Sequence, residues 1–202
     1  RPKRRTRAMI AREKGLEPLA ELIYQQSPST NPETEARKYI TAEGAAVAED
    51  LRVADVAAAL HGARDILAER VNDDADARAK IRQLFLSQGF IRSEVISGKE
   101  AEGAKFKDYF DWSEPLASAP SHRVLAIRRG AAEGFLSFQV RPPEEDALRI
   151  LEAQFVRGQN ASSEQVRLAV RDSYKRLLAF SMETEARLDS KRRADSAAIE
   201  VF

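Results

Sequence analysis

The chain contains no cysteine among its 202 residues. This absence excludes disulfides, thiol catalysis, zinc fingers and iron–sulfur clusters, and it is typical of proteins of a reducing cytoplasm. No apolar run approaches the roughly 18 residues that are needed to cross a bilayer, and no signal peptide precedes the body of the chain. We therefore expect a cytoplasmic protein that does not enter a membrane.

The residues that common active sites require are scarce. The only two histidines, His61 and His122, stand far apart, and no H-E-x-x-H motif or glycine-rich phosphate loop is present. The serine before His122 is adjacent in sequence, so the two side chains diverge and do not form a nucleophile–base pair. The aspartates within 73–76 lack the spacing of a calcium loop and suit the start of a helix instead. The sequence predicts no enzyme, no metal site and no cofactor.

Charge is balanced over the whole chain but is unevenly distributed. The chain has 33 Lys and Arg against 32 Asp and Glu, a net charge of +1. Seven of the basic residues and a single acid, Glu13, stand in the first fourteen positions, which leaves 26 basic and 31 acidic residues, or −5, in the remainder. The positive charge is therefore local, and the body is not a general polyanion binder.

Start and stop signals of helices cover most of the sequence. Thr6 is a suitable N-cap for a helix that ends at Gly15, Pro18 suits the first turn of the next helix, and Asn31-Pro32 starts a third. The length of the chain allows one sizeable core or two small ones. Asp55 is expected to start a further helix. Another should begin at Asp73–Asp74 and end at Gly89, and one more should begin at Ser121 and end at Gly130.

Only one stretch, FLSFQV at 135–140, alternates as a strand does, and the segment 99–112 is expected to be helical in its second half. Ser162 and Gln165 form a capping-box pattern before a long helix that runs from about Ser163 into the 190s. About thirty helical residues would span roughly 45 Å, so we expect this helix to reach a neighbouring domain. The predicted fold is mainly α: a multi-helix region with a long C-terminal helix and at most one or two short strands near 134–140.

Two clusters of positively charged residues can each be interpreted in two ways. The first is the opening run, and the second is the segment HRVLAIRRG, in which Val124, Leu125 and Ile127 are expected to face inward and Arg128 and Arg129 outward. The cations can bind phosphates, or they can pair with carboxylates at a domain junction and complement a helix end. The candidate nucleic-acid or junction contacts are Lys3, Arg4, Arg5, Arg7, Arg12, Arg128 and Arg129.

Four stretches together resemble the family of the bacterial transcription accessory protein Tex: PKRRTRAMIAREKGLEPLA, ALHGARDILAERV, PSHRVLAIRRG and SYKRLLAFSMETEARLDSKRRADSAAIEVF. The resemblance runs from Arg1 to Phe202, in the order and at about the spacing of the family. It implies that residues 1–202 are the central helical region of a larger protein. Within it, 1–26 would be a basic junction segment, 31–141 a helical body, and 144–202 the helices that lead to a ribonuclease-H-like domain.

The resemblance also implies a cytoplasmic protein that associates with nucleic acid. Family members carry an N-terminal helical part, a ribonuclease-H-like domain, helix-hairpin-helix modules and an OB-type RNA-binding domain, and the last supplies their best-supported nucleic-acid contacts. The first residue, Arg1, and the apolar ending AAIEVF likewise predict a piece of a longer protein. The expected partners are RNA or DNA, bound mainly through domains outside this sequence, with RNA polymerase as a further candidate; we expect a monomer.

One position departs from the family pattern. Phe180 stands where family members commonly have proline, so the long helix is expected to run on without a break there. The resemblance implies no catalytic residue. The leading hypothesis is a non-catalytic scaffold module that organises nucleic-acid-binding domains, and the alternative is a platform that docks RNA polymerase or another transcription factor. An enzyme with an unrecognised site is a third possibility.

Overall fold

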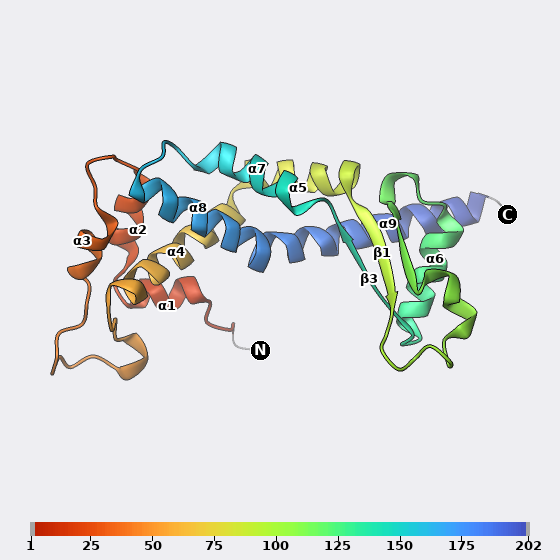
Figure 1. Cartoon of the computed structure of the whole chain (residues 1–202), viewed down its shortest axis with the longest axis horizontal. Coiled ribbons are helices and arrows are strands. Elements are labelled where there is room, and N and C mark those ends of the chain that lie inside the picture. Colours follow the sequence, from red (N-terminus) through yellow and green to blue (C-terminus); the bar gives the residue numbers. More distant parts are fainter. Residues whose placement is uncertain (1–2, 201–202) are drawn as a thin grey trace. The chain divides into compact units, whose positions relative to one another are not determined.

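The computed structural model describes residues 3–200 and divides the chain into two units (Figure 1). Unit 1 comprises Arg1–Ala77 and Leu148–Leu177, and unit 2 comprises Arg78–Ala147 and Leu178–Phe202. Nine α-helices and one three-stranded sheet lie within the described residues. The predicted mainly α class is therefore confirmed, and of the two arrangements that the length allows the chain adopts two small cores.

Unit 1 is built around one helix, α4 (Val56–Asp73). This helix packs against α1 (Arg7–Glu13), α2 (Glu17–Tyr24), α3 (Pro32–Arg37) and α8 (Ala161–Ser173). The unit also contains the larger part of α7 (Glu144–Phe155). The largest fully buried side chains of this core are Leu16, Leu19, Ile23, Ile66, Leu67 and Leu151.

The N-caps of unit 1 follow the sequence prediction. The hydroxyl of Thr6 accepts a hydrogen bond from the Met9 amide, and the carboxylate of Asp55 accepts one from the Ala58 amide. Asn31 caps α3 in the same way, and Gly15 ends the first helical segment with a φ of +78°, a conformation that glycine adopts without strain. These signals are local, so they could be read correctly without knowledge of the tertiary structure.

A single glycine sets how closely α4 approaches the segment between α1 and α2. A Cβ atom at Gly62 would lie 2.3 Å from the Leu16 Cδ1 atom and 3.5 Å from the Ala11 side chain. The absence of a side chain at this position allows Leu16 to be fully buried against α4.

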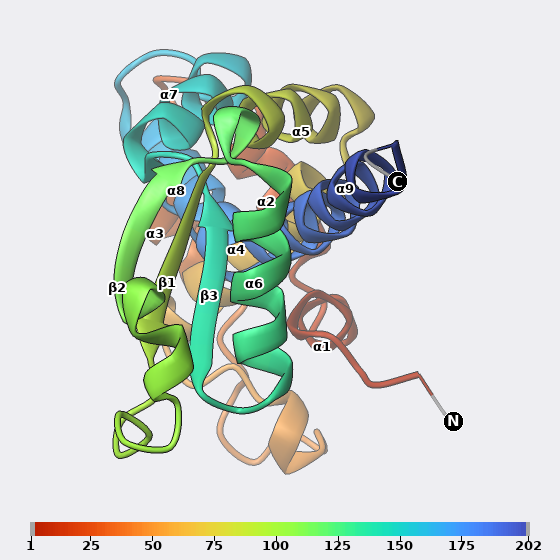
Figure 2. The same cartoon turned by 90° about the vertical axis from the view of Figure 1, so that its right-hand side faces the viewer.

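Unit 2 contains an antiparallel sheet in the order β2-β1-β3 (Figure 2), formed by β1 (Phe90–Val95), β2 (Asp111–Pro115) and β3 (Leu136–Arg141). Helices α6 (Ser121–Ala132) and α9 (Ala179–Glu200) pack against each other and against β3, and the C-terminal part of α5 (Ala75–Gln88) belongs to the same unit. The buried apolar side chains include Ile91, Val124, Ile127, Leu136, Val140 and Met182.

The strand near 134–140 is confirmed as β3, but β1 and β2 lie outside the stretch to which strands were assigned. The segment 99–112, expected to be helical in its second half, forms a short 3-10 helix (Ala104–Tyr109) that leads into β2. The side chains of β1 and β2 that face the core include Ser93, Trp112 and Glu114. Because two of these three are polar, the two strands do not show the alternation of apolar and polar residues by which a strand is recognised in a sequence. Ser93 is buried because its hydroxyl donates to the Tyr109 carbonyl at 2.7 Å.

Three helix boundaries also differ from the prediction. Helix α6 begins with Ser121 after a Pro120 cap position and continues past Gly130 to Ala132. Gly130 is instead a packing glycine, since a Cβ atom there would lie 2.5 Å from the Leu136 Cδ1 atom. The cap of α8 is Asn160, whose side-chain oxygen accepts from the Ser163 amide at 2.9 Å, and not Ser162.

The long C-terminal helix is continuous over residues 161–200. It consists of α8, a π-helical turn at Tyr174–Leu178, and α9. The division between the two units falls within the π-helical turn. The helix is longer than the thirty residues predicted, and Phe180 lies within it without a break, as expected.

A buried carboxylate joins α9 to the edge of the sheet. Glu183 is 8% exposed, and its two oxygens accept from the Val140 amide and from the Arg141 Nε atom, each at 2.9 Å. The amide of Val140 lies on the side of β3 that faces away from β1, so this bond satisfies an edge group that would otherwise lack a partner.

The π-helical turn allows a test at Phe180. A proline in a helix interior costs about 3 kcal/mol because it removes an i→i−4 hydrogen bond and clashes with the carbonyl four residues earlier. The π-helical turn just before Phe180 already departs from the i→i−4 pattern, so we expect Phe180→Pro to cost less than half of that amount. The matched control is Leu188→Pro, an exposed position in the middle of the same helix, which should show the full cost. Urea unfolding measures both, and equal losses of unfolding free energy for the two variants would contradict this account.

Candidate functional site

Two of the predicted cationic contacts are ion-paired within unit 1. Arg5 pairs with Glu13 and lies 3.6 Å from the Asp50 carboxylate. The Arg12 guanidinium lies 2.7 Å from Glu69 on α4 and 3.8 Å from a further carboxylate at the start of α2. These pairs connect the segment around α1 to other parts of the same unit. The role at a junction between domains stays a prediction.

The other cations of the opening run have a different environment. Lys3, Arg4 and Arg7 are exposed, and within residues 3–200 none of them forms an ion pair. Arg1 lies outside the described residues. Among its described cations, the opening run therefore has two ion-paired arginines, Arg5 and Arg12, and three exposed cations without an ion pair; the seventh basic residue of the run, Lys14, is half-buried beside α4.

A hollow of about 320 Å³ lies between α1 and α4. Arg7, Lys14 and His61 bring basic groups to it, and the carboxylate of Asp65 lies among them. Its remaining lining is apolar or small: Ile10, Ala11, Ala58 and Gly62.

Asp65 is the buried titratable group of this hollow. Burial raises the pKa of the Asp65 carboxyl above its ordinary value, and nearby Asp172 acts in the same direction. The positive groups that oppose this rise are the His61 ring, whose Nδ1 atom lies 3.4 Å from the carboxylate, Arg176 at 3.8 Å, and Arg7. The net effect of the environment is to disfavour the ionised form.

The two candidate arginines of α6 do not share one environment. Arg129 is exposed, whereas Arg128 is half-buried and its guanidinium carbon lies 5.7 Å from the centroid of the Phe138 ring. As predicted, Val124 and Ile127 on the same helix are buried. Arg129 thus faces solvent, whereas Arg128 lies partly against β3; the expectation that both point toward solvent or a partner stays a prediction for partner contact.

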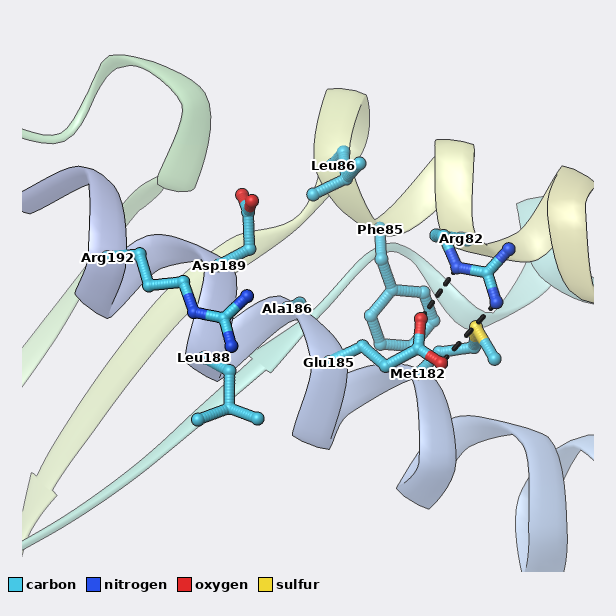
Figure 3. A pocket seen from close by; sticks show the side chains of 9 residues that line it. All are labelled: Arg82, Phe85, Leu86, Met182, Glu185, Ala186, Leu188, Asp189 and Arg192. Atoms are coloured by element: carbon cyan, nitrogen blue, oxygen red, sulfur yellow. Dashed lines mark hydrogen bonds and ion pairs between the residues drawn. The ribbon is translucent and has the colours of Figure 1, made fainter.

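A shallow groove of about 280 Å³ separates α5 from α9 in unit 2 (Figure 3). Its floor consists of Phe85, Met182 and Ala186, all buried. An ion pair bridges it, because Arg82 donates from Nε to Glu185 at 2.6 Å, and this hydrogen bond lowers the pKa of the Glu185 carboxyl. Other side chains at its rim are Leu86, Leu188, Asp189 and Arg192.

The described residues contain no cluster of three or more metal-ligating His, Cys, Asp or Glu side chains. No helix between residues 3 and 200 is both long and apolar enough to cross a bilayer. The side-chain groupings that the structure does form are ion pairs, arginine–aromatic contacts and the groove.

Sequence analysis missed three residues of these groupings: Phe138, Glu183 and Arg187. Arg187 lies 3.9 Å from the Phe138 ring and thus on the same ring as Arg128, although the two arginines stand 59 positions apart in sequence. No local pattern connects them. A partial signal for Glu183 existed, since an acid one position after Met182 can share the buried face of the helix and then requires a partner.

The chain is similar to known bacterial proteins over its whole length. A family model described as "Tex central region-like" matches residues 27–202. The chain is 42% identical to protein YhgF of Escherichia coli over 212 aligned positions, and 36% identical to the transcriptional accessory protein Tex of Neisseria gonorrhoeae over 208; each match covers all of this chain and 26% of the relative. Protein tex of Bordetella pertussis is 48% identical over 69% of the chain and 17% of the relative. The chain thus spans about a quarter of the length of the first two.

The ion pairs of the opening run predict a specific loss of stability. Arg5→Gln with Arg12→Gln should lower the unfolding free energy by about 1 kcal/mol, because each arginine has one close ion pair and an exposed pair contributes on the order of 0.5 kcal/mol. Lys3→Gln with Arg4→Gln removes the same charge from the same segment and should change it by less than about 0.5 kcal/mol. Urea unfolding at low salt measures both, and equal effects of the two double variants would show that the ion pairs of Arg5 and Arg12 do not stabilise unit 1.

Asp65 predicts a pH dependence whose sign is set by its raised pKa. The folded state binds the Asp65 proton more tightly than the unfolded state does, so this group stabilises most below its unfolded pKa of 3.8, and the contribution is lost as pH rises through the folded pKa. Asp65→Asn removes that dependence. The unfolding free energy of the wild type, minus that of the variant, should therefore fall as pH rises above 3.8. A difference that stays constant or rises between about pH 4 and 7 would contradict the assignment.

Proposed function

Because the chain belongs to the Tex central-region-like family, we propose that it is a non-catalytic helical scaffold module of a cytoplasmic transcription accessory protein. The module is monomeric and carries no cofactor. It positions nucleic-acid-binding domains that lie elsewhere in the longer protein, as the names of its relatives and their greater length suggest.

The observation that carries this proposal is the continuous helix over residues 161–200. Its first part packs in unit 1 and its last part packs in unit 2, so one uninterrupted element contributes to both cores. Long helices that extend past one compact unit are suited to connecting domains. The buried acids and several arginines of the chain are engaged in ion pairs and hydrogen bonds, which is consistent with a structural role.

Nucleic acid is the proposed partner, bound mainly through domains outside this sequence. The body of the chain carries a net charge of −5, which does not favour strong binding of a polyanion by the module as a whole. Local contacts are still available, since Lys3, Arg4, Arg7 and Arg129 are exposed.

A second candidate is a docking platform for RNA polymerase or another transcription factor. The groove between α5 and α9 favours it, because Leu188 at its rim is 49% exposed above a buried apolar floor. An apolar side chain beside charged groups on a groove is a common feature of protein interaction sites.

Thiol labelling separates the scaffold from the platform. The chain has no cysteine, so Leu188→Cys introduces a single reactive group into it, and Glu43→Cys in an exposed loop of unit 1 is the control for intrinsic reactivity. The scaffold predicts that Cys at 188 reacts at least tenfold more slowly in the full-length protein than in this chain, because the other domains cover α9. The platform predicts equal rates, with protection only after RNA polymerase is added. Mass spectrometry of the labelled peptide reports both rates.

A further inference from the structure

Two arginines in unit 2 lie against one phenylalanine ring. Arg187 of α9 places its guanidinium carbon 3.9 Å from the centroid of Phe138 on β3, and Arg128 of α6 places its own at 5.7 Å. The Nη1 atom of Arg128 also donates to the backbone carbonyl of Arg187 at 3.4 Å. We call Arg128 and Arg187 the arginine pair. All three side chains are half-buried, and they come from three different elements.

The arginine pair differs from the other arginines of this unit that stack on rings. Arg123 also lies over an aromatic ring, but it pairs with Glu114 at 2.8 Å, and Arg141 does the same with Glu183 at 2.9 Å. The arginine pair has no ion pair with a carboxylate of residues 3–200. The fold therefore neutralises the other stacked arginines but leaves this pair with two like charges on one ring.

The environment of the pair also acts on the pKa of Arg128. Burial lowers the pKa of its guanidinium, and the positive charge of Arg187 lowers it further. Asp195 is the carboxylate that opposes this effect, but its own carboxylate lies 2.9 Å from the Lys191 ammonium. An anion bound between the two guanidiniums would remove the repulsion between them.

We propose that the arginine pair binds a phosphate group, and specifically that of a nucleic-acid backbone. Each guanidinium carries five N–H donors in a rigid planar fork, and the ring of Phe138 limits the orientations of both forks. A backbone phosphodiester has two non-bridging oxygens in a tetrahedral arrangement, so each oxygen can accept from one of the two forks. The assignment to a nucleic-acid backbone rests on the proposed function, whereas the phosphate site itself rests on the geometry.

The first test is stabilisation by inorganic phosphate. The pair variant is Arg128→Gln with Arg187→Gln, and the control is Lys105→Gln with Lys107→Gln, which removes the same charge from exposed positions of the same unit. Replacing chloride by phosphate at constant ionic strength should raise the melting temperature of the wild type and the control by a few degrees. The pair variant should show a smaller rise, limited to the non-specific stabilisation that phosphate gives to any folded protein. Circular dichroism confirms that each variant is folded, and Arg187→Gln alone replaces the pair variant if that does not fold.

The second test is a titration with single-stranded RNA at several salt concentrations. Loss of two phosphate contacts should lower the slope of log affinity against log salt by about 1.4, since each contact on a single strand contributes about 0.7. The control variant should keep the slope of the wild type. Duplex DNA, on which each contact contributes about 0.9, should show a correspondingly larger decrease of about 1.8.

Each other outcome would overturn the proposal. Equal phosphate stabilisation of the wild type and the pair variant would show that the site is not at the arginine pair. Stabilisation by an acidic peptide such as oligoglutamate, but not by phosphate, would assign the pair to a protein partner. Stabilisation by phosphate with an unchanged RNA slope would assign it to free phosphate or a small phosphorylated molecule. The scaffold proposal is tested by the labelling rate of Leu188→Cys, which none of these outcomes affects. Failure of the phosphate site and failure of the scaffold are therefore distinguished.

Discussion

Each unit of this chain depends on a different stretch of one C-terminal helix for its core. In unit 1 the buried residues of α8 include Val166 and Val170, and the hydroxyl of Ser173 donates to the Ala68 carbonyl of α4 at 2.6 Å. In unit 2 the buried face of α9 is formed largely by small or flexible side chains, Met182, Ala186 and Ala194. Such side chains permit close packing of a helix on its neighbours. Neither core is complete without residues from beyond position 147.

The chain's arginines form two groups that composition cannot distinguish. Arg12 and Arg141 lie beside carboxylates and stabilise the contacts between elements of their own units. Arg128 and Arg187 share an aromatic ring without a carboxylate partner in the described part of the chain. Because a counter-charge determines whether an arginine is structural or available, the arginine content of the opening run was a weaker guide to binding than the pairing of each residue.

The parts of the fold that sequence could predict are those that depend on neighbours within one helical turn. The caps at Thr6, Asn31 and Asp55 are of this kind, and the strand β3 has an apolar alternation of its own. The capping box at Ser162 failed because Asn160, two residues earlier, supplies the side-chain acceptor.

The parts that sequence could not predict depend on contacts between distant segments. Strands β1 and β2 bury polar residues such as Ser93, whose partner Tyr109 lies 16 positions away. Glu183 and Val140 are 43 positions apart, and the arginine pair 59. For the opening run, the sequence showed the positive charge but not the partners of the arginines. Arg5 and Arg12 pair with acids that include Asp50 and Glu69, and no local sequence pattern connects these acids to the run.

The dependence of both cores on one continuous helix is most directly tested by native-state hydrogen exchange of this chain. The account predicts that amides of α8 and of α9 up to about residue 195 exchange far more slowly than those of the loop at 41–48, because burial and helical hydrogen bonds protect them. Amides from residue 179 onward that exchange as fast as the loop would show that α9 does not pack in unit 2, and that result would contradict the account.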